Sequence, residues 1–121
     1  MWLPMSAAAS PDLVFAALAH PARRRMLDLL VEAPGMTVKA LASHFDFSRI
    51  AAQKHLKTLE AAGLVLSERE GRQRRLFFNA VPIQLIYERW TDQYGRFWAG
   101  RMSDIQARVE ARAQGRKNEH A

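Results

Sequence analysis

The sequence predicts a mainly α-helical domain that carries one small β-hairpin, and three patterns support this fold class. Residues 37–65 show helical apolar spacing on both sides of a short polar break, which is typical of two helices joined by a tight turn. Two short segments around a glycine-containing polar loop follow and predict the hairpin. A stripe of large apolar residues then continues to residue 109 and predicts a long final helix. Together these elements make a winged helix-turn-helix, with long N- and C-terminal helices expected to form a dimer interface.

Length and composition favour one domain with a polyanionic partner. The 121 residues are enough for a single modest core. We expect a flexible tail at residues 1–10, the winged helix-turn-helix domain at residues 11–112, and a flexible tail at residues 113–121. The formal net charge of +6 does not by itself distinguish nucleic acid from an anionic membrane surface. The absence of cysteine excludes disulfides, thiolate metal sites and cysteine redox sensing.

The N-terminal residues give no targeting signal. No Lys or Arg precedes their apolar side chains, and Pro4 and Pro11 interrupt any continuous apolar run. No stretch of the sequence approaches the roughly 20 apolar residues of a membrane span. The sequence therefore predicts a cytoplasmic protein without a membrane partner.

Two helices are expected before the helix-turn-helix. Ser10 and Pro11 form a strong helix start, and the pair His20-Pro21 ends the first helix and begins the second. The second helix ends at residues 34–35, which are Pro-Gly. Its first turn holds three consecutive arginines at 23–25, which oppose the helix dipole. They point either to an external anion or carboxylate partner, or to solvated arginines with local pairs.

The first helix of the motif is short and has one apolar face. Val38, Leu41 and Phe45 recur at helical spacing, and Thr37 is placed to cap the helix. The break at residues 46–48 ends in Ser48, whose hydroxyl can accept an unpaired N–H of the next helix. The second helix of the motif is therefore expected to begin at about residue 49.

That second helix presents a polar face and buries an apolar one. Leu56 and Leu59 follow the inward stripe, and Gly63 is placed to end the helix in the left-handed conformation. Arg, Gln and Lys at i, i+4 and i+8 can present hydrogen-bonding groups to base edges and phosphates in a major groove. The alternative is an ordinary solvated helix face. The outward residues and their flanks are Arg49, Ile50, Gln53, Lys54 and Lys57.

The hairpin is expected from strands at residues 64–67 and 75–79 around a polar loop. Leu76 and Phe78 can face the core, since alternate residues of a strand share a face. Arg72, Arg74 and Arg75 can then reach phosphates or a minor groove. The alternative is a solvated turn whose charge is partly compensated by the glutamates at 68 and 70.

The last helix is expected to run from residue 82 to about residue 112. A helix of about 30 residues spans roughly 45 Å, which is more than the small winged domain can cover. We therefore expect its aromatic stripe, with part of the first helix, to pack against a second copy. The alternative is a pocket for an apolar or cationic effector. The expected interface residues are Leu13, Phe15, Tyr87, Trp90, Tyr94, Phe97, Trp98, Met102 and Ile105.

The sequence resembles the ArsR family of bacterial winged-helix repressors from about residue 18 to residue 109. The stretches LAHPARRRML at 18–27, SRIAAQKHL at 48–56 and AGLV at 62–65, with EGR at 70–72, carry the resemblance. It implies a homodimeric repressor that binds a palindromic operator. This chain departs from the family's usual pattern at His20, which should weaken a helix cap, and at Ile50, where many members have proline. The cysteine, histidine and carboxylate sets of metal-sensing members are missing.

No other chemistry is supported by the sequence. His44 and Asp46 form a close His–carboxylate pair, which is too few ligands for a metal site. His55 is assigned either to packing or to a phosphate contact. No catalytic Ser, His and Asp set and no Gly-rich phosphate loop is recognisable. We therefore expect no enzymatic activity, no cofactor and no metal.

The predicted function is sequence-specific DNA binding by a homodimeric transcriptional repressor that occludes a promoter. Arg49, Gln53 and Ser48 are assigned to base edges, Lys54 and Lys57 to bases or backbone, and the wing arginines to phosphates or a minor groove. Two alternatives stay open: an effector-gated sensor that binds a small ligand between aromatic C-terminal helices, and a winged-helix protein-interaction module without DNA binding.

Overall fold

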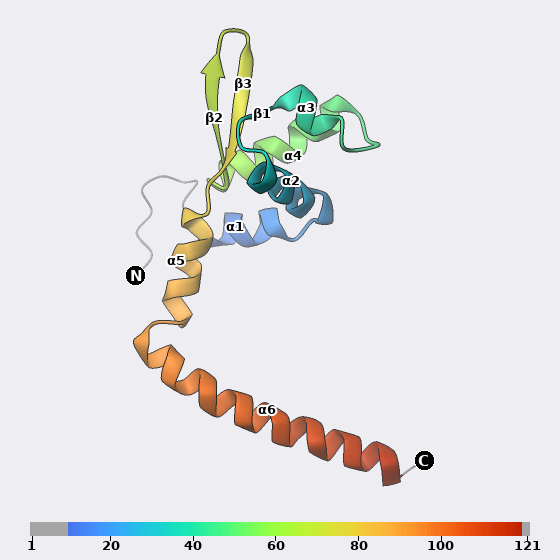
Figure 1. Ribbon diagram of the computed structural model, residues 1–121, viewed down its shortest axis with the longest axis vertical. Coiled ribbons are helices and arrows are strands. Elements are labelled where there is room, and N and C mark those ends of the chain that lie inside the picture. The colour runs from blue at the N-terminus through green and yellow to red at the C-terminus, as the bar shows by residue number, and fades with distance from the viewer. Residues whose placement is uncertain (1–9, 120–121) are drawn as a thin grey trace. The chain divides into compact units, whose positions relative to one another are not determined.

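The computed structural model of the protein describes residues 10–119, except for the side chains of Gln93, Tyr94 and Arg96 (Figure 1). The predicted N-terminal tail lies almost entirely outside the described residues. The chain divides into two compact units, residues 1–86 and residues 87–121, and each is described by itself. No helix within residues 10–119 is long and apolar enough to cross a membrane.

Helices α1 (Pro11–Leu18) and α2 (Pro21–Glu32) open the first unit. Helix α1 has eight residues and is therefore shorter than the long N-terminal helix that we expected. Pro11 occupies its first turn, but Ser10, at the capping position, makes no side-chain capping hydrogen bond. His20 does cap α2, because its Nδ1 accepts the N–H of Ala22 at 3.1 Å. His20, which we expected to weaken this cap, therefore still makes a capping hydrogen bond.

Two of the three arginines at the start of α2 are held by the end of α1. Arg23 donates from Nε to the carbonyl of Ala17 at 2.7 Å and from Nη2 to that of Ala16 at 3.0 Å. Arg24 donates to the carbonyl of Leu18 at 2.6 Å. Cations are favourable at a helix C-terminus, where carbonyl groups lack intrahelical partners. The local partners of Arg23 and Arg24 are therefore backbone carbonyls.

The helix-turn-helix consists of α3 (Val38–Ala42) and α4 (Arg49–Ala61). Two capping hydrogen bonds confirm the predicted caps of both helices. The Thr37 hydroxyl accepts the N–H of Ala40 at 3.1 Å, and the Ser48 hydroxyl accepts that of Ala51 at 3.1 Å. Gly63 follows α4 with a φ of 75°, a left-handed conformation that glycine adopts without strain.

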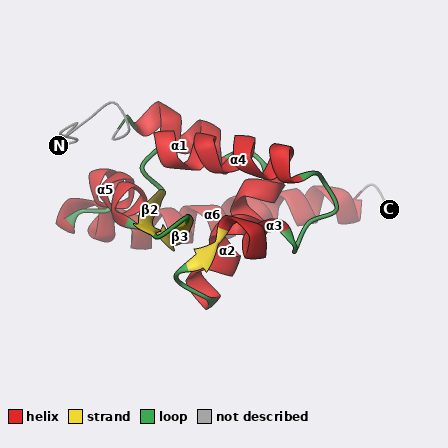
Figure 2. Cartoon of the chain, turned by 90° about the horizontal axis from the view of Figure 1, so that it is seen from above, coloured by secondary structure: helices red, strands yellow, loops and turns green. Residues whose placement is uncertain are grey.

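The wing is a hairpin of β2 (Val65–Glu70) and β3 (Gln73–Phe78), whose tip holds Gly71 at a φ of 63°. The strands pair from Val65↔Phe78 to Glu70↔Gln73. The prediction of a long polar loop between them was therefore wrong. Most of that segment belongs to the strands, and the turn is tight. The hairpin stands out from the helices of its unit in Figure 1 and is seen nearly end-on in Figure 2.

A third strand, β1 (Met36–Thr37), was not expected. It pairs antiparallel with β3 through Met36↔Leu76 and Thr37↔Arg75, giving the strand order β1-β3-β2. The N–H of Gly35 also donates to the carbonyl of Leu76 at 2.8 Å. This short strand joins the wing to the residue that caps α3.

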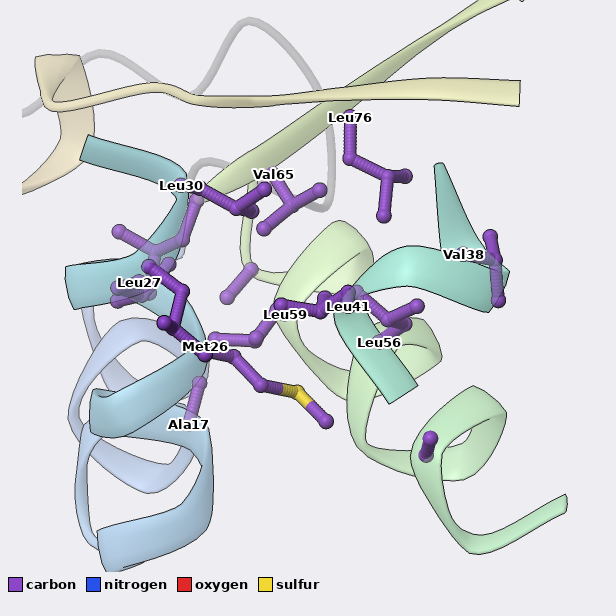
Figure 3. Close-up of a cluster of buried hydrophobic side chains, with 14 of the residues drawn as sticks. Ala17, Met26, Leu27, Leu30, Val38, Leu41, Leu56, Leu59, Val65 and Leu76 are labelled. Carbon is purple, nitrogen blue, oxygen red and sulfur yellow. The ribbon is translucent and has the colours of Figure 1, made fainter. Parts of the chain in front are cut away.

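The core of the first unit lies between the helices and the inner face of the sheet. Figure 3 shows Met26 and Leu30 of α2, Leu56 and Leu59 of α4 and Leu76 of β3 pointing toward one another. These five side chains are fully buried. The apolar face of α4 is therefore fixed by packing, which leaves the opposite face outward.

The C-terminal region contains two helices, α5 (Val81–Trp90) and α6 (Gln93–Glu119). The prediction of one helix from residue 82 to residue 112 was wrong. The Asp92 carboxylate accepts the N–H of Gly95 at 2.9 Å, so Asp92 caps a new helix where the apolar stripe alone predicts continuity. A Cβ at Gly95 would lie 2.8 Å from the Trp90 carbonyl oxygen. Helix α6 also continues through residues 113–119, where we expected a polar tail.

Candidate nucleic-acid interface

The outward face of α4 carries the predicted reading residues. Arg49, Gln53, Lys54 and Lys57 are exposed, and Ile50 is 67% exposed. The residues at the inward positions of the same helix, Ala52, Leu56 and Leu59, are fully buried. Because a packed helix has little rotational freedom, the polar face is presented in one orientation. This is the geometry that a helix needs to enter a major groove.

The Ser48 cap sets where this helix begins. We expect Ser48→Ala to lower the free energy of unfolding by about 1 kcal/mol, because the N–H of Ala51 loses its partner. Urea denaturation of the purified protein would measure the change. Asparagine also caps helices well, so Ser48→Asn should keep most of the stability. Equal losses in the two variants would contradict a capping role.

The three predicted wing arginines differ in their surroundings. Arg74 donates to Glu60 at 2.9 Å, and Arg75 donates to Glu70 at 3.2 Å and to the carbonyl of Gly35 at 3.3 Å. Arg72 is exposed beside the tip and has no such partner among the described residues. Glu70 thus compensates part of the wing's charge, as the solvated-turn alternative proposed, and Arg72 is the wing arginine most available to a ligand.

A basic cleft of about 270 Å³ lies where the helix-turn-helix meets the wing. It brings Arg49 and Gln53 of α4 together with Arg72 and Arg74 of the wing. It also contains Lys39 of α3 and Arg69 of β2, which the sequence analysis did not single out. Alternation along β2 could have identified Arg69, because Val65, Ser67 and Arg69 lie on the same face of that strand. The lining residues are Thr37, Val38, Lys39, Arg49, Gln53, Arg69, Arg72, Gln73 and Arg74.

His55 lies at the margin of the buried face of α4, outside the residues that line the cleft. Its ring centroid is 4.6 Å from that of His20 and 5.3 Å from that of Phe47, and its Nδ1 lies 3.3 Å from Nη1 of Arg23. Burial, followed by the charges of His20 and Arg23, lowers the pKa of His55 from its ordinary value of 6.5. Of the two roles left open for His55, these contacts support packing.

This shift makes stability depend on pH. The unfolded chain protonates His55 more readily than the folded chain, so the contribution of the neutral ring is fully present above pH 6.5 and is lost as the pH falls toward the folded pKa. We expect urea denaturation to give a smaller free energy of unfolding at pH 5.5 than at pH 7.5. His55→Gln should flatten this dependence, while His44→Gln, at an exposed position, should retain it. An unchanged profile in His55→Gln would contradict the assignment.

Large apolar side chains are exposed on α1, α5 and α6. Leu13 and Phe15 of α1 are 40% and 47% exposed, and Trp90 and Phe97 are 61% and 62% exposed. The Tyr94 side chain, also predicted here, lies outside the described residues. Within residues 10–119, no group of three or more His, Asp or Glu side chains is placed to hold a metal ion. The other predicted interface residues that are exposed are Tyr87, Trp98, Met102 and Ile105.

Comparisons with known proteins cover the same elements. A family model described as a helix-turn-helix domain matches residues 18–68, which contain α3 and α4. The transcriptional repressor SdpR of Bacillus subtilis (strain 168) is 37% identical over 71 residues, which are 59% of this chain and 78% of SdpR.

Two solved structures of transcriptional regulators are also similar to this chain. An ArsR-like transcriptional regulator from Rhodococcus sp. RHA1 is 32% identical with a TM-score of 0.62, over 83% of this chain and 90% of that one. A homodimeric winged helix-turn-helix DNA-binding domain from Mycobacterium bovis, described as a possible ArsR-family transcriptional regulator, is 29% identical with a TM-score of 0.55. That match covers 61% of this chain and 68% of the other.

Proposed function

We propose that this chain, which belongs to the ArsR family of winged helix-turn-helix transcriptional regulators, is a homodimeric repressor that reads a palindromic operator with α4. The observation that carries the proposal is that α4 is buried on one side and exposed on the other. Its apolar side is fixed in the core, and Arg49 and Gln53 project from the other side beside a basic cleft. The proposed site of action is the cytoplasm.

Each exposed group has a role that its chemistry allows. Arginine can donate two hydrogen bonds to guanine, and glutamine can exchange two with adenine, so Arg49 and Gln53 are assigned to base edges. Ser48 and Ile50 lie at the start of the same face. Lys54 and Lys57 supply contacts to bases or phosphates, and the wing supplies phosphate or minor-groove contacts, chiefly through Arg72.

A second copy is supported by the exposed apolar side chains of α1, α5 and α6. Isolated exposed apolar residues are common, but several on one helix, such as Phe97, Trp98, Met102 and Ile105 of α6, are typical of an interaction site. The similar Mycobacterium bovis domain is described as homodimeric. A two-fold dimer would place its recognition helices about 34 Å apart, in successive major grooves of a palindromic site. Occlusion of a promoter by the bound dimer would give repression, the activity named for the relative SdpR.

The test compares DNA from immediately upstream of the gene with unrelated DNA of equal length, by fluorescence anisotropy at two salt concentrations. Tighter, saturable binding to the upstream DNA supports a sequence-specific regulator. Equal and strongly salt-dependent binding to both DNAs contradicts specific recognition of that region. Binding to neither by a folded dimer would favour an interaction module instead. Size-exclusion chromatography with light scattering tests the dimer separately.

The wing makes a distinct prediction. We expect Arg72→Ala to weaken binding to all DNA sequences and to reduce the slope of log affinity against log salt by about one, because one phosphate contact is lost. Anisotropy titrations over a series of salt concentrations would measure the slope. Arg25→Ala removes another exposed arginine, on α2 and outside the cleft, and should leave the slope unchanged. Equal slopes for Arg72→Ala and the wild type would exclude this contact.

A further inference from the structure

The cleft between the helix-turn-helix and the wing carries positive charge that the described chain neutralises only in part. Five of its lining residues are cationic and none is acidic. Only Arg74 among them forms an ion pair with a described residue, at 2.9 Å from Glu60. Lys39, Arg49, Arg69 and Arg72 converge from α3, α4, β2 and the wing tip without a carboxylate partner in residues 10–119.

The hairpin register adds an independent sign of an anion site. Arg69 and Arg74 are directly opposite each other on β2 and β3, on the face that turns toward the helices. Like charges at such positions repel and destabilise a hairpin. Glu60 compensates Arg74 and leaves Arg69 uncompensated. An anion between the two strands and α4 would relieve this repulsion.

The type of cation indicates the type of anion. Four of the five lining cations are arginines, whose planar forks fit phosphate oxygens in a bidentate manner. Gln53 and Gln73 add neutral amide donors to the same wall. The Thr37 hydroxyl already accepts the N–H of Ala40, which keeps the start of α3 in place beside Lys39.

We propose that this cleft is a phosphate-binding site that takes phosphate or pyrophosphate groups even without DNA. The proposal rests on the proposed function in one respect: in the DNA complex, a backbone phosphate fills the cleft. A solute with phosphate groups then competes directly with DNA, so the affinity of the regulator for its operator falls as that solute accumulates. Lys39 and Arg69 become phosphate ligands beyond those expected from the sequence.

The first experiment titrates sodium pyrophosphate into the full-length protein without DNA, at constant ionic strength, by calorimetry and by NMR of backbone amides and arginine side chains. We expect saturable binding and chemical-shift changes concentrated at Lys39, Gln53 and Arg69. The Lys39→Gln/Arg69→Gln double variant should raise the dissociation constant about tenfold or more, since charged hydrogen bonds are lost. Both side chains are exposed, so the variant should keep the wild-type melting temperature.

Arg25→Gln is the matched control, because it removes one exposed charge from the same unit outside the cleft. Wild-type pyrophosphate affinity in Arg25→Gln supports a localised site. Non-saturating binding, or equal weakening in Arg25→Gln and the double variant, would overturn the proposal in favour of diffuse attraction.

A second experiment separates the two sources of phosphate. Pyrophosphate should displace upstream DNA at a concentration near its own dissociation constant, and the double variant should weaken DNA binding while keeping the preference for upstream DNA. Specific DNA binding that neither pyrophosphate nor the double variant affects would overturn this inference and leave the proposed function intact. Saturable pyrophosphate binding without any DNA binding would support the anion site and overturn the proposed function.

Discussion

Replacing Leu56 by alanine is expected to lower the free energy of unfolding by about 2 to 5 kcal/mol, the range for a buried leucine that leaves a cavity. Leu56 is fully buried on the inner face of α4 (Figure 3). The buried cluster that contains Leu56 also takes side chains from α2, α3 and the sheet, so no single element can move to fill the space. The recognition helix would therefore lose the packing that fixes its orientation.

Urea denaturation would measure this loss, and Ile50→Ala is the control on the same helix. Ile50 is 67% exposed, so its removal should change stability by no more than about 0.5 kcal/mol. DNA binding should weaken in both variants, through a lost surface contact in Ile50→Ala and through the loosened recognition helix in Leu56→Ala. A Leu56→Ala protein as stable as the Ile50→Ala protein would contradict the described core.

Arg49→Ala and Gln53→Ala are each expected to weaken binding to the operator by about 1 to 3 kcal/mol, the cost of a lost bidentate base contact. Both side chains are exposed and outside the core, so stability should stay within about 0.5 kcal/mol of the wild type. The loss should be smaller on unrelated DNA, because only the operator offers the matching bases. The ratio of the two affinities is therefore the informative quantity.

Anisotropy titrations of each variant on operator and unrelated DNA would give that ratio. Arg25→Ala, which removes an exposed arginine from α2, should change neither affinity nor ratio. If Arg49→Ala and Gln53→Ala also left both unchanged, α4 would not be the reading element. A uniform loss on both DNAs would instead assign Arg49 and Gln53 to phosphates.

Local signals in the sequence were sufficient for the helix-turn-helix. Thr37 and Ser48 cap the helices as expected, because capping depends on residues only three positions apart. Gly63 ends α4 in the left-handed conformation for a similarly local reason. The outward row on α4 follows from the 3.6-residue period once the buried leucines are identified.

Contacts between distant segments were not predictable from such signals. Strand β1 is two residues long and pairs with residues about 40 positions away, so no local pattern marks it. The cleft takes residues from four segments, and the Arg74–Glu60 pair joins the wing to α4. The break after α5 was missed because a single Asp92 cap competes with a continuous apolar stripe.

Strand β1 also has a consequence for the length of DNA that the protein can recognise. Strand β1 pairs with β3 through Met36 and through Thr37, the residue that caps α3, and so holds the hairpin beside the helix-turn-helix. We therefore expect the wing and α4 not to adjust to a longer or shorter half-site. Their separation is set before DNA is encountered, so little ordering entropy is lost on contact. Inserting one base pair between the groove read by α4 and the flank reached by the wing should therefore sever one of the two contacts.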